Sequence, residues 1–108
     1  MTAYIQTVLS RPVPGAEEEF NRWYESTHMP EVLSLPGFVA GQRYAPADPS
    51  DPYLAVYDIE ANGIDAIHEA VRIGSSSMTI SDALDPDSVV VQVFQAQGPR
   101  ALSPGTSR

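Results

Sequence analysis

Both faces of the predicted strand at residues 89–97 are apolar, and this constrains the fold more than any other feature. Successive side chains of a strand point to opposite faces. The alternation gives two apolar sets: Val89, Val91 and Val93 on one face, and Val90, Phe94 and Ala96 on the other. The predicted strand at residues 53–60 is apolar on both faces in the same way. Helices of the chain can cover only one face of such a sheet, so we expect a second copy of the chain to cover the other in a homodimer.

Hydrophobic patterning and turn residues predict six elements in the order β-α-β-β-α-β. Strands are expected over residues 4–10, 38–44, 53–60 and 89–97. Helices are expected over 17–28, with a further turn or two over 30–35, and over 63–73, with Asn62 as the N-cap of this last helix. The segment 78–87 fits either a short helix around residues 81–84 or a loop. This order indicates an α+β, ferredoxin-like sandwich with two helices on one face of an antiparallel sheet. Residues 1–97 then form a single domain, and residues 98–108 form a flexible tail.

Length and net charge limit the kinds of molecule that this protein is expected to bind. A chain of 108 residues builds one ordinary core, and its formal net charge of −8 disfavours nucleic acids and anionic membranes. No apolar run approaches the roughly 18 residues needed to cross a bilayer, and the first residues lack the pattern of a signal peptide. We therefore expect a cytoplasmic protein whose partners are a small molecule and a second copy of itself.

Composition also narrows the chemistry. The chain has no Cys, which excludes thiol nucleophiles, thiolate metal sites and disulfides. Every basic residue is Arg, so Schiff-base chemistry on a lysine is excluded as well. The two histidines, His28 and His68, do not have the close spacing of metal-ligand pairs, so we expect no metal site and no cofactor.

The first predicted helix gathers most of the aromatic and titratable side chains. Phe20 and Tyr24 fall on one stripe at 3.6 residues per turn, with Trp23 on one flank and His28 on the other. Pro30 lacks a backbone N–H and disfavours helical geometry in the preceding residue. We therefore expect a kink just after His28 that leaves backbone groups unpaired and opens space for a ligand.

Three stretches carry a likeness to a known family: Phe20-x-x-Trp23-Tyr24-x-x-x-His28-Met29-Pro30, Leu35-Pro36-Gly37-Phe38 and Arg43-Tyr44. Together with the element order over residues 3–97, they resemble the dimeric α/β-barrel superfamily, and within it EthD-like and small monooxygenase-like proteins. The resemblance implies a dimer whose sheets pack face to face, with a ligand cavity between sheet and helices in each protomer. In a similar lactone isomerase, a histidine at the position of His28 transfers protons together with a cysteine, and this chain has no cysteine.

His28 is the foremost candidate for a catalytic residue, because its ordinary pKa of about 6.5 suits an acid or base near neutrality. The alternative is that its imidazole caps the kinked helix by bonding a free carbonyl. Tyr24, four residues earlier, could bring a hydroxyl beside it. His68 lies on the apolar stripe of the second helix and could border the same cavity, although a lone histidine there is more often part of the core.

Several further residues are candidates for substrate contact. Arg43 and Tyr44 alternate on the second strand, so they face opposite sides, with Tyr44 expected on the side of Phe38. Arg43 could pair with Asp58 or bind a substrate carboxylate or enolate. The remaining candidates for cavity walls are aromatic: Phe20, Trp23, Tyr57 and Phe94.

These observations favour a small cofactor-independent enzyme that acts by proton transfer, as an isomerase, cyclase or lyase. Its substrate would be an apolar, carbonyl-bearing molecule of aromatic or polyketide-like character, with Tyr24 or His68 stabilising the oxyanion. Two alternatives stay open at this point: a cofactor-free monooxygenase that uses the same base, and a non-catalytic small-molecule binding protein.

Overall fold

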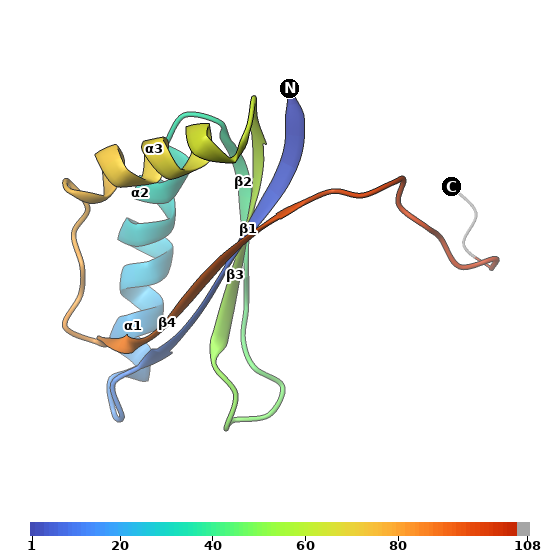
Figure 1. The fold of residues 1–108 in the computed structure, drawn as a ribbon. Coiled ribbons are helices and arrows are strands. Elements are labelled where there is room, and N and C mark those ends of the chain that lie inside the picture. Colours follow the sequence, from blue (N-terminus) through green and yellow to red (C-terminus); the bar gives the residue numbers. More distant parts are fainter. Residues whose placement is uncertain (106–108) are drawn as a thin grey trace.

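A computed structural model describes residues 1–105 of the chain. The elements follow the order β1 (Thr2–Pro12), α1 (Glu17–Trp23), η1 (Tyr24–His28), α2 (Met29–Leu33), β2 (Phe38–Tyr44), β3 (Tyr53–Ala61), α3 (Ile64–Ser75) and β4 (Leu84–Gln95). The helices lie on one side of the sheet and leave its other side without a helix (Figure 1). The predicted β-α-β-β-α-β order and α+β ferredoxin-like class are confirmed.

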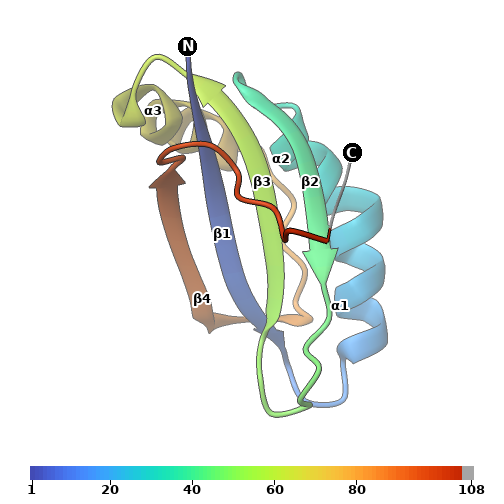
Figure 2. The same ribbon diagram turned by 90° about the vertical axis from the view of Figure 1, so that its right-hand side faces the viewer.

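The four strands form one antiparallel sheet in the order β2-β3-β1-β4 (Figure 2). Strand β1 is central, with Gln6 opposite Tyr57 of β3 on one side and opposite Val93 of β4 on the other. Because register sets which side chains share a face, Tyr4, Gln6, Val8 and Ser10 of β1 point toward the helices together with the odd-numbered residues of β3.

The first helix runs without a break from Glu17 to Leu33 through a π-helical turn at residues 24–28. The disturbance predicted beside Pro30 therefore takes the form of a π turn that ends at His28, and no break follows it. In the π turn, the Met29 N–H donates to the Tyr24 carbonyl five residues earlier, which widens the helix without interrupting it. Pro30 then lies in the first turn of α2, a position at which its missing N–H is tolerated.

Two other expectations about elements are corrected. Strand β4 begins at Leu84 rather than residue 89, because Leu84 pairs with Pro12 beyond a register shift in β1. A short helix around residues 81–84 is thereby ruled out, and Ser81 to Ala83 form a turn. The predicted cap at Asn62 is also absent, since α3 starts after Gly63 with no side-chain cap hydrogen bond.

The core lies between the helices and the sheet. Its most buried large side chains, each at most 1 % exposed, are Phe20, Tyr57, Ile59 and Ile67. The helix-free face of the sheet is also apolar, since Ile5, Val90 and Phe94 lie there with between 37 % and 49 % of their surface exposed. This confirms the expected apolar character of both faces.

Residues 96–105 have no helix or strand and leave the sheet on its helix-free side (Figure 1). The last three positions of the predicted tail, 106–108, lie outside the described residues. The division into a domain over residues 1–97 and a flexible tail stays a prediction. Within residues 1–105, no helix has the length and apolar character that crossing a bilayer requires.

Candidate functional site

The π turn brings His28 onto Trp23. In an α-helix, two residues five positions apart point about 140° away from each other. Here the two rings are stacked, with centroids 4.7 Å apart and planes inclined by 19°. Tyr24 meets the imidazole edge-on, at 5.0 Å and 89°. The widened turn thus sets His28 among aromatic rings, and sequence reasoning, which placed Trp23 and His28 on opposite flanks, did not foresee this stacking.

Two adjoining hollows between the helices and the sheet meet at His28. One has a volume of about 300 Å³ and is lined by Val8, Ser10, Trp23, Tyr24, His28, Ile80, Leu84, Pro86 and Val89. The other, of about 220 Å³, lies toward α3 and includes Gln6, Tyr57 and Val71 in its wall. Val8, His28, Ile80 and Val89 line both. We call the pair the His28 hollows.

Four residues in the walls of the His28 hollows each carry a buried polar atom without a hydrogen-bond partner. These atoms are the Ser10 Oγ, the Tyr24 Oη, the His28 Nδ1 and the Tyr57 Oη. Each of these residues lines one or both of the hollows, and the structure describes no other buried side-chain atom in this condition within residues 1–105. Because a buried polar group without a partner costs free energy, such a cluster in apolar walls is typical of a site that a ligand completes.

The ionisation states of the three rings suit proton transfer. Burial lowers the pKa of His28, and the negative charge of Glu31 opposes this in part, so the imidazole is neutral at neutral pH. Burial raises the pKa of both Tyr24 and Tyr57. The two hydroxyls lie close enough to affect each other as donor and acceptor, although their geometry falls short of a hydrogen bond; this lowers the pKa of Tyr24 and raises that of Tyr57, while Arg43 lowers both. Both phenols are therefore protonated and able to donate a hydrogen bond.

Arg43 contacts the Tyr24 ring through its guanidinium and does not reach the His28 hollows. Its guanidinium donates to the Asn21 Oδ1 at 2.8 Å and to the Glu25 carboxylate at 3.3 Å, so the predicted pairing with Asp58 is wrong. The guanidinium carbon lies 4.5 Å from the centroid of the Tyr24 ring, within the range of a cation–π contact. With its side chain only 12 % exposed, Arg43 lines neither of the His28 hollows.

The register of β2 corrects the face assigned to Tyr44. The pairing with β3 shifts between Phe38 and Ala40, and an irregularity of this kind changes which residues point to one side. Phe38 is buried against Tyr57 on the helix side, whereas Tyr44 is 51 % exposed. Tyr44 therefore does not share a face with Phe38 and does not line the His28 hollows.

Three other predicted site residues lie away from the His28 hollows. Phe94 pairs with Ile5 on the helix-free face, and Phe20 is completely buried in the core. His68 is exposed and lines a neighbouring hollow of about 390 Å³ together with Gln6 and Arg72. The prediction that His28 and His68 border one cavity is thus wrong, although the two hollows adjoin.

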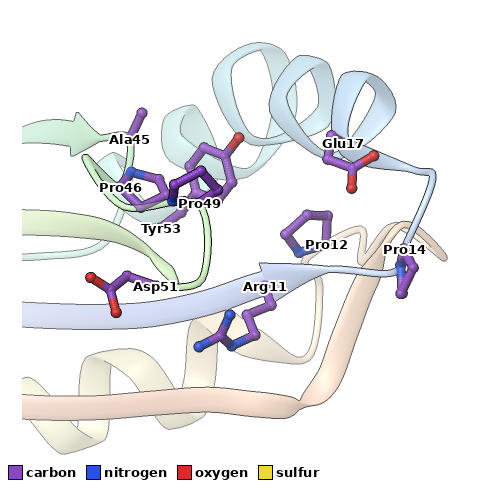
Figure 3. A pocket seen from close by; sticks show the side chains of 9 residues that line it. All are labelled: Arg11, Pro12, Pro14, Glu17, Ala45, Pro46, Pro49, Asp51 and Tyr53. Carbon is purple, nitrogen blue, oxygen red and sulfur yellow. The ribbon is translucent and has the colours of Figure 1, made fainter.

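A further hollow, of about 440 Å³, lies at the end of the sheet where β1 leads into α1 (Figure 3). Prolines form much of its wall, and Arg11, Glu17 and Asp51 give it charges of both signs. Arg11 already donates to the Ser50 carbonyl at 2.8 Å. Since no unpartnered buried atom faces it, this hollow lacks the feature that distinguishes the His28 hollows.

Comparison with known proteins gives relatives by structure alone. No protein-family model matches the chain. No curated protein sequence matches it either. A dimeric ferredoxin-like protein from an uncultured marine organism matches with a TM-score of 0.66 and 10% identity, covering 95% of each chain. The heme-degrading protein MhuD from Mycobacterium tuberculosis, with two hemes bound in its active site, matches with a TM-score of 0.65 and 14% identity, covering 91% of this chain and 99% of the other. A mutant of SnoaB, a cofactor-independent oxygenase from Streptomyces nogalater, matches with a TM-score of 0.58 and 15% identity, covering 94% and 98%.

The chain has the ferredoxin-like fold of the dimeric α/β-barrel proteins. An EthD family protein from Bacillus halodurans is also among the structures with this fold, at a TM-score of 0.59. The resemblance seen in the sequence is thus confirmed at the level of the fold. At identities this low, the likeness leaves the chemistry to be argued from the chain's own residues.

Some residues of the His28 hollows were not predicted from the sequence. Ser10 and Gln6 are buried polar residues on the helix-facing side of β1, and Ile80 comes from the connection between α3 and β4. Gln6, Val8 and Ser10 are two residues apart in turn, so their side chains lie on the same face of β1. Two polar residues on a face that packs against helices could have indicated a site from the sequence alone. Ile80 carried no such signal, because its place depends on the path of an irregular segment. No group of three potential metal ligands occurs within the described residues 1–105.

Proposed function

We propose that this protein is a small enzyme that binds an apolar, oxygen-bearing molecule in the His28 hollows and transfers a proton within it. The observation that carries the proposal is the cluster of four buried, unpartnered polar atoms in otherwise apolar walls. Ligand oxygens that meet these atoms would remove the free-energy cost of leaving them unpaired. An aromatic ketone or a polyketide-like molecule has this combination of apolar surface and oxygen atoms.

The chemistry follows from the protonation states. The neutral His28 accepts a proton through Nδ1 from a carbon next to the substrate carbonyl, and the C–H electron pair moves to the carbonyl oxygen. A protonated phenol, Tyr24 or Tyr57, donates a hydrogen bond to the resulting enolate oxygen. Return of the proton from the imidazolium to another atom completes an isomerisation, and the same enolate can begin a cyclisation or an elimination. His68 has no part in this step, because it lines a different hollow.

A second candidate is a cofactor-free monooxygenase, in which the same enolate reacts with molecular oxygen. The observation that favours it is the structural likeness to SnoaB, which is described as a cofactor-independent oxygenase. Oxygen uptake during turnover distinguishes the two reactions. If a ligand binds in the His28 hollows but never reacts, the protein is a carrier. The absence of a cofactor and the cytoplasmic location stay predictions from the sequence.

Ligand binding can be followed at Trp23, the chain's one tryptophan, which lines the larger of the His28 hollows. We expect acetonaphthone to shift the Trp23 indole signal in an NMR titration. Ethylnaphthalene, its match without the carbonyl oxygen, should bind more weakly. Tyr57→Phe removes one donor worth about 1 kcal/mol, so affinity for the ketone should fall roughly fivefold and affinity for the hydrocarbon should not. Equal affinities for both compounds in every variant would contradict a polar role for the cluster.

We further propose that the protein is a homodimer that buries the helix-free face of the sheet. The exposed apolar side chains on that face, among them Val90 and Phe94, favour this, as does the dimeric ferredoxin-like relative. Light scattering at micromolar concentration should give twice the 11.7 kDa mass of the chain. Phe94→Glu should shift the mass toward the monomer, whereas Ile73→Glu on the helix side should not. A monomeric wild-type protein would contradict this proposal.

A further inference from the structure

The connection between α3 and β4, residues 76–83, runs beside the first helix and forms one wall of the His28 hollows (Figure 1). Ile80 of this connection lines both hollows although 56 % of its surface is exposed, and Met78 lines the smaller one. The Ile80 side chain can stay there only if the backbone beside it is held in place. The hydrogen bonds of the adjacent Thr79 show what holds it.

Thr79 is tied to the first helix at both of its backbone polar groups. The Trp23 indole N–H donates to the Thr79 carbonyl at 2.8 Å. The Thr79 N–H donates to the Glu31 carboxylate, whose two oxygens are each 3.2 Å away. Trp23 and Glu31 lie on either side of His28 along the helix, so these two bonds fasten the connection across the histidine.

The same bonds orient the indole on which His28 stacks. The stacked rings, with centroids 4.7 Å apart, leave the imidazole little freedom to turn while the indole is anchored through its N–H. Glu31 is therefore coupled to His28 by a chain of contacts: it accepts from the Thr79 N–H, the Thr79 carbonyl accepts from Trp23, and Trp23 stacks on His28. A second, direct influence is the carboxylate charge, which raises the pKa of His28 against the effect of burial. The other titratable groups nearby, Tyr24 at the edge of the ring and Tyr57 in the wall of the smaller hollow, are neutral phenols whose pKa burial raises.

We infer that Glu31 is a positioning residue for His28, which fastens the Thr79 backbone so that Trp23 fixes the imidazole and Ile80 closes the hollow. The inference rests on the proposed function only in taking His28 as the base. Its physical content, the coupling of Glu31 to Trp23 and His28, exists without any substrate. Its failure can therefore be distinguished from a failure of the proposed reaction.

The test compares Glu31→Gln and Glu31→Ala with Glu18→Gln in the full-length protein without ligand. Glu18 is a matched control, because it carries the same charge on the first helix but is almost fully exposed and pairs only with Arg22. NMR gives two readouts that a merely structural role would not move together. One is the pKa of the His28 ring, and the other is the exchange rate of the Trp23 indole N–H with solvent.

Glu31→Gln removes the charge but keeps an oxygen that can accept from the Thr79 N–H. We expect it to lower the pKa of His28 by about 0.2 to 0.7 pH units and leave indole exchange nearly unchanged. Glu31→Ala removes charge and acceptor, so the pKa should fall similarly and indole exchange should become roughly tenfold faster. Glu18→Gln should change neither.

Two outcomes would overturn the inference. If Glu31→Ala leaves indole exchange at the wild-type rate, the Thr79 bonds do not depend on Glu31. If Glu18→Gln lowers the pKa of His28 as much as Glu31→Gln, the charge acts only through the general field of the protein. With a substrate in hand, Glu31→Ala should lower kcat more than it raises KM, since it misplaces the base rather than removing a binding contact.

Discussion

Phe20→Ala is expected to lower the free energy of unfolding by about 3–5 kcal/mol, the range for removing a fully buried aromatic ring. Phe20 is 0 % exposed, and its ring packs against Tyr24 at 5.7 Å and against Tyr53 at 5.3 Å between ring centroids. The guanidinium of Arg43 lies 5.7 Å from the same ring. Removing the ring leaves a cavity under the helix that carries His28, and the surrounding aromatic side chains are too constrained to fill it.

Urea unfolding at a fixed protein concentration measures this loss, since dimerisation would make apparent stability depend on concentration. Phe20→Leu is the matched control and should cost clearly less, because it keeps most of the buried volume. Ile73→Ala, at an exposed position on the helix side, should stay within about 0.5 kcal/mol of the wild type. A loss below 1 kcal/mol for Phe20→Ala would show that the aromatic core is misplaced.

Replacing His28 by Gln is expected to lower turnover of a substrate by about 10²–10⁴-fold, the usual contribution of a general acid or base. The amide of Gln can form hydrogen bonds but cannot transfer protons near neutral pH. His28 is partly buried and its Nδ1 has no hydrogen-bond partner, so no bond to this atom is lost on substitution. Both His28→Gln and His28→Ala remove the ring that stacks on Trp23, so each should lose about 0.5–1.5 kcal/mol of stability, and His28→Ala should lose turnover to a similar degree.

The competing interpretation makes His28 a helix cap. In that case His28→Ala would lose stability and activity together, whereas His28→Gln, whose amide can bond the same carbonyl, would keep both. The unpartnered Nδ1 and the unbroken helix through Pro30 already weigh against a cap at this nitrogen. Full turnover by His28→Gln would exclude His28 as the base. Equal binding without turnover in all three proteins would instead favour the carrier.

The fold was predictable from the sequence because its determinants are local or periodic. Strand alternation and turn residues were sufficient to predict β2 with the bounds that the structure has, and they placed β3 and α3 to within two residues. The two-sided apolar pattern of Val89 to Phe94 also correctly indicated a sheet with a second apolar face. These features depend on each segment's own residues, so no knowledge of the contacts between segments was needed.

The details of the site depended on contacts that a single segment does not encode. The pattern around Pro30 indicated a disturbance, but whether the helix breaks or widens depends on packing, and the widened turn is what stacks His28 on Trp23. The shift between Phe38 and Ala40 reversed the face of Tyr44, because a bulge becomes visible only in the pairing with a neighbouring strand. The partners of Arg43 could not be predicted either, because Asn21 and Glu25 belong to the first helix and not to a neighbouring strand of the sheet.

The most direct test of the central claim is a crystal structure of the protein with acetonaphthone bound. We expect the ring system in the His28 hollows, beside Trp23 and Ile80. Its carbonyl oxygen should lie about 2.6–3.2 Å from the hydroxyl of Tyr24 or Tyr57, with the carbon beside that carbonyl facing the His28 Nδ1. A ligand bound elsewhere, with the Ser10, Tyr24, His28 and Tyr57 atoms hydrogen-bonded within the protein, would contradict this claim.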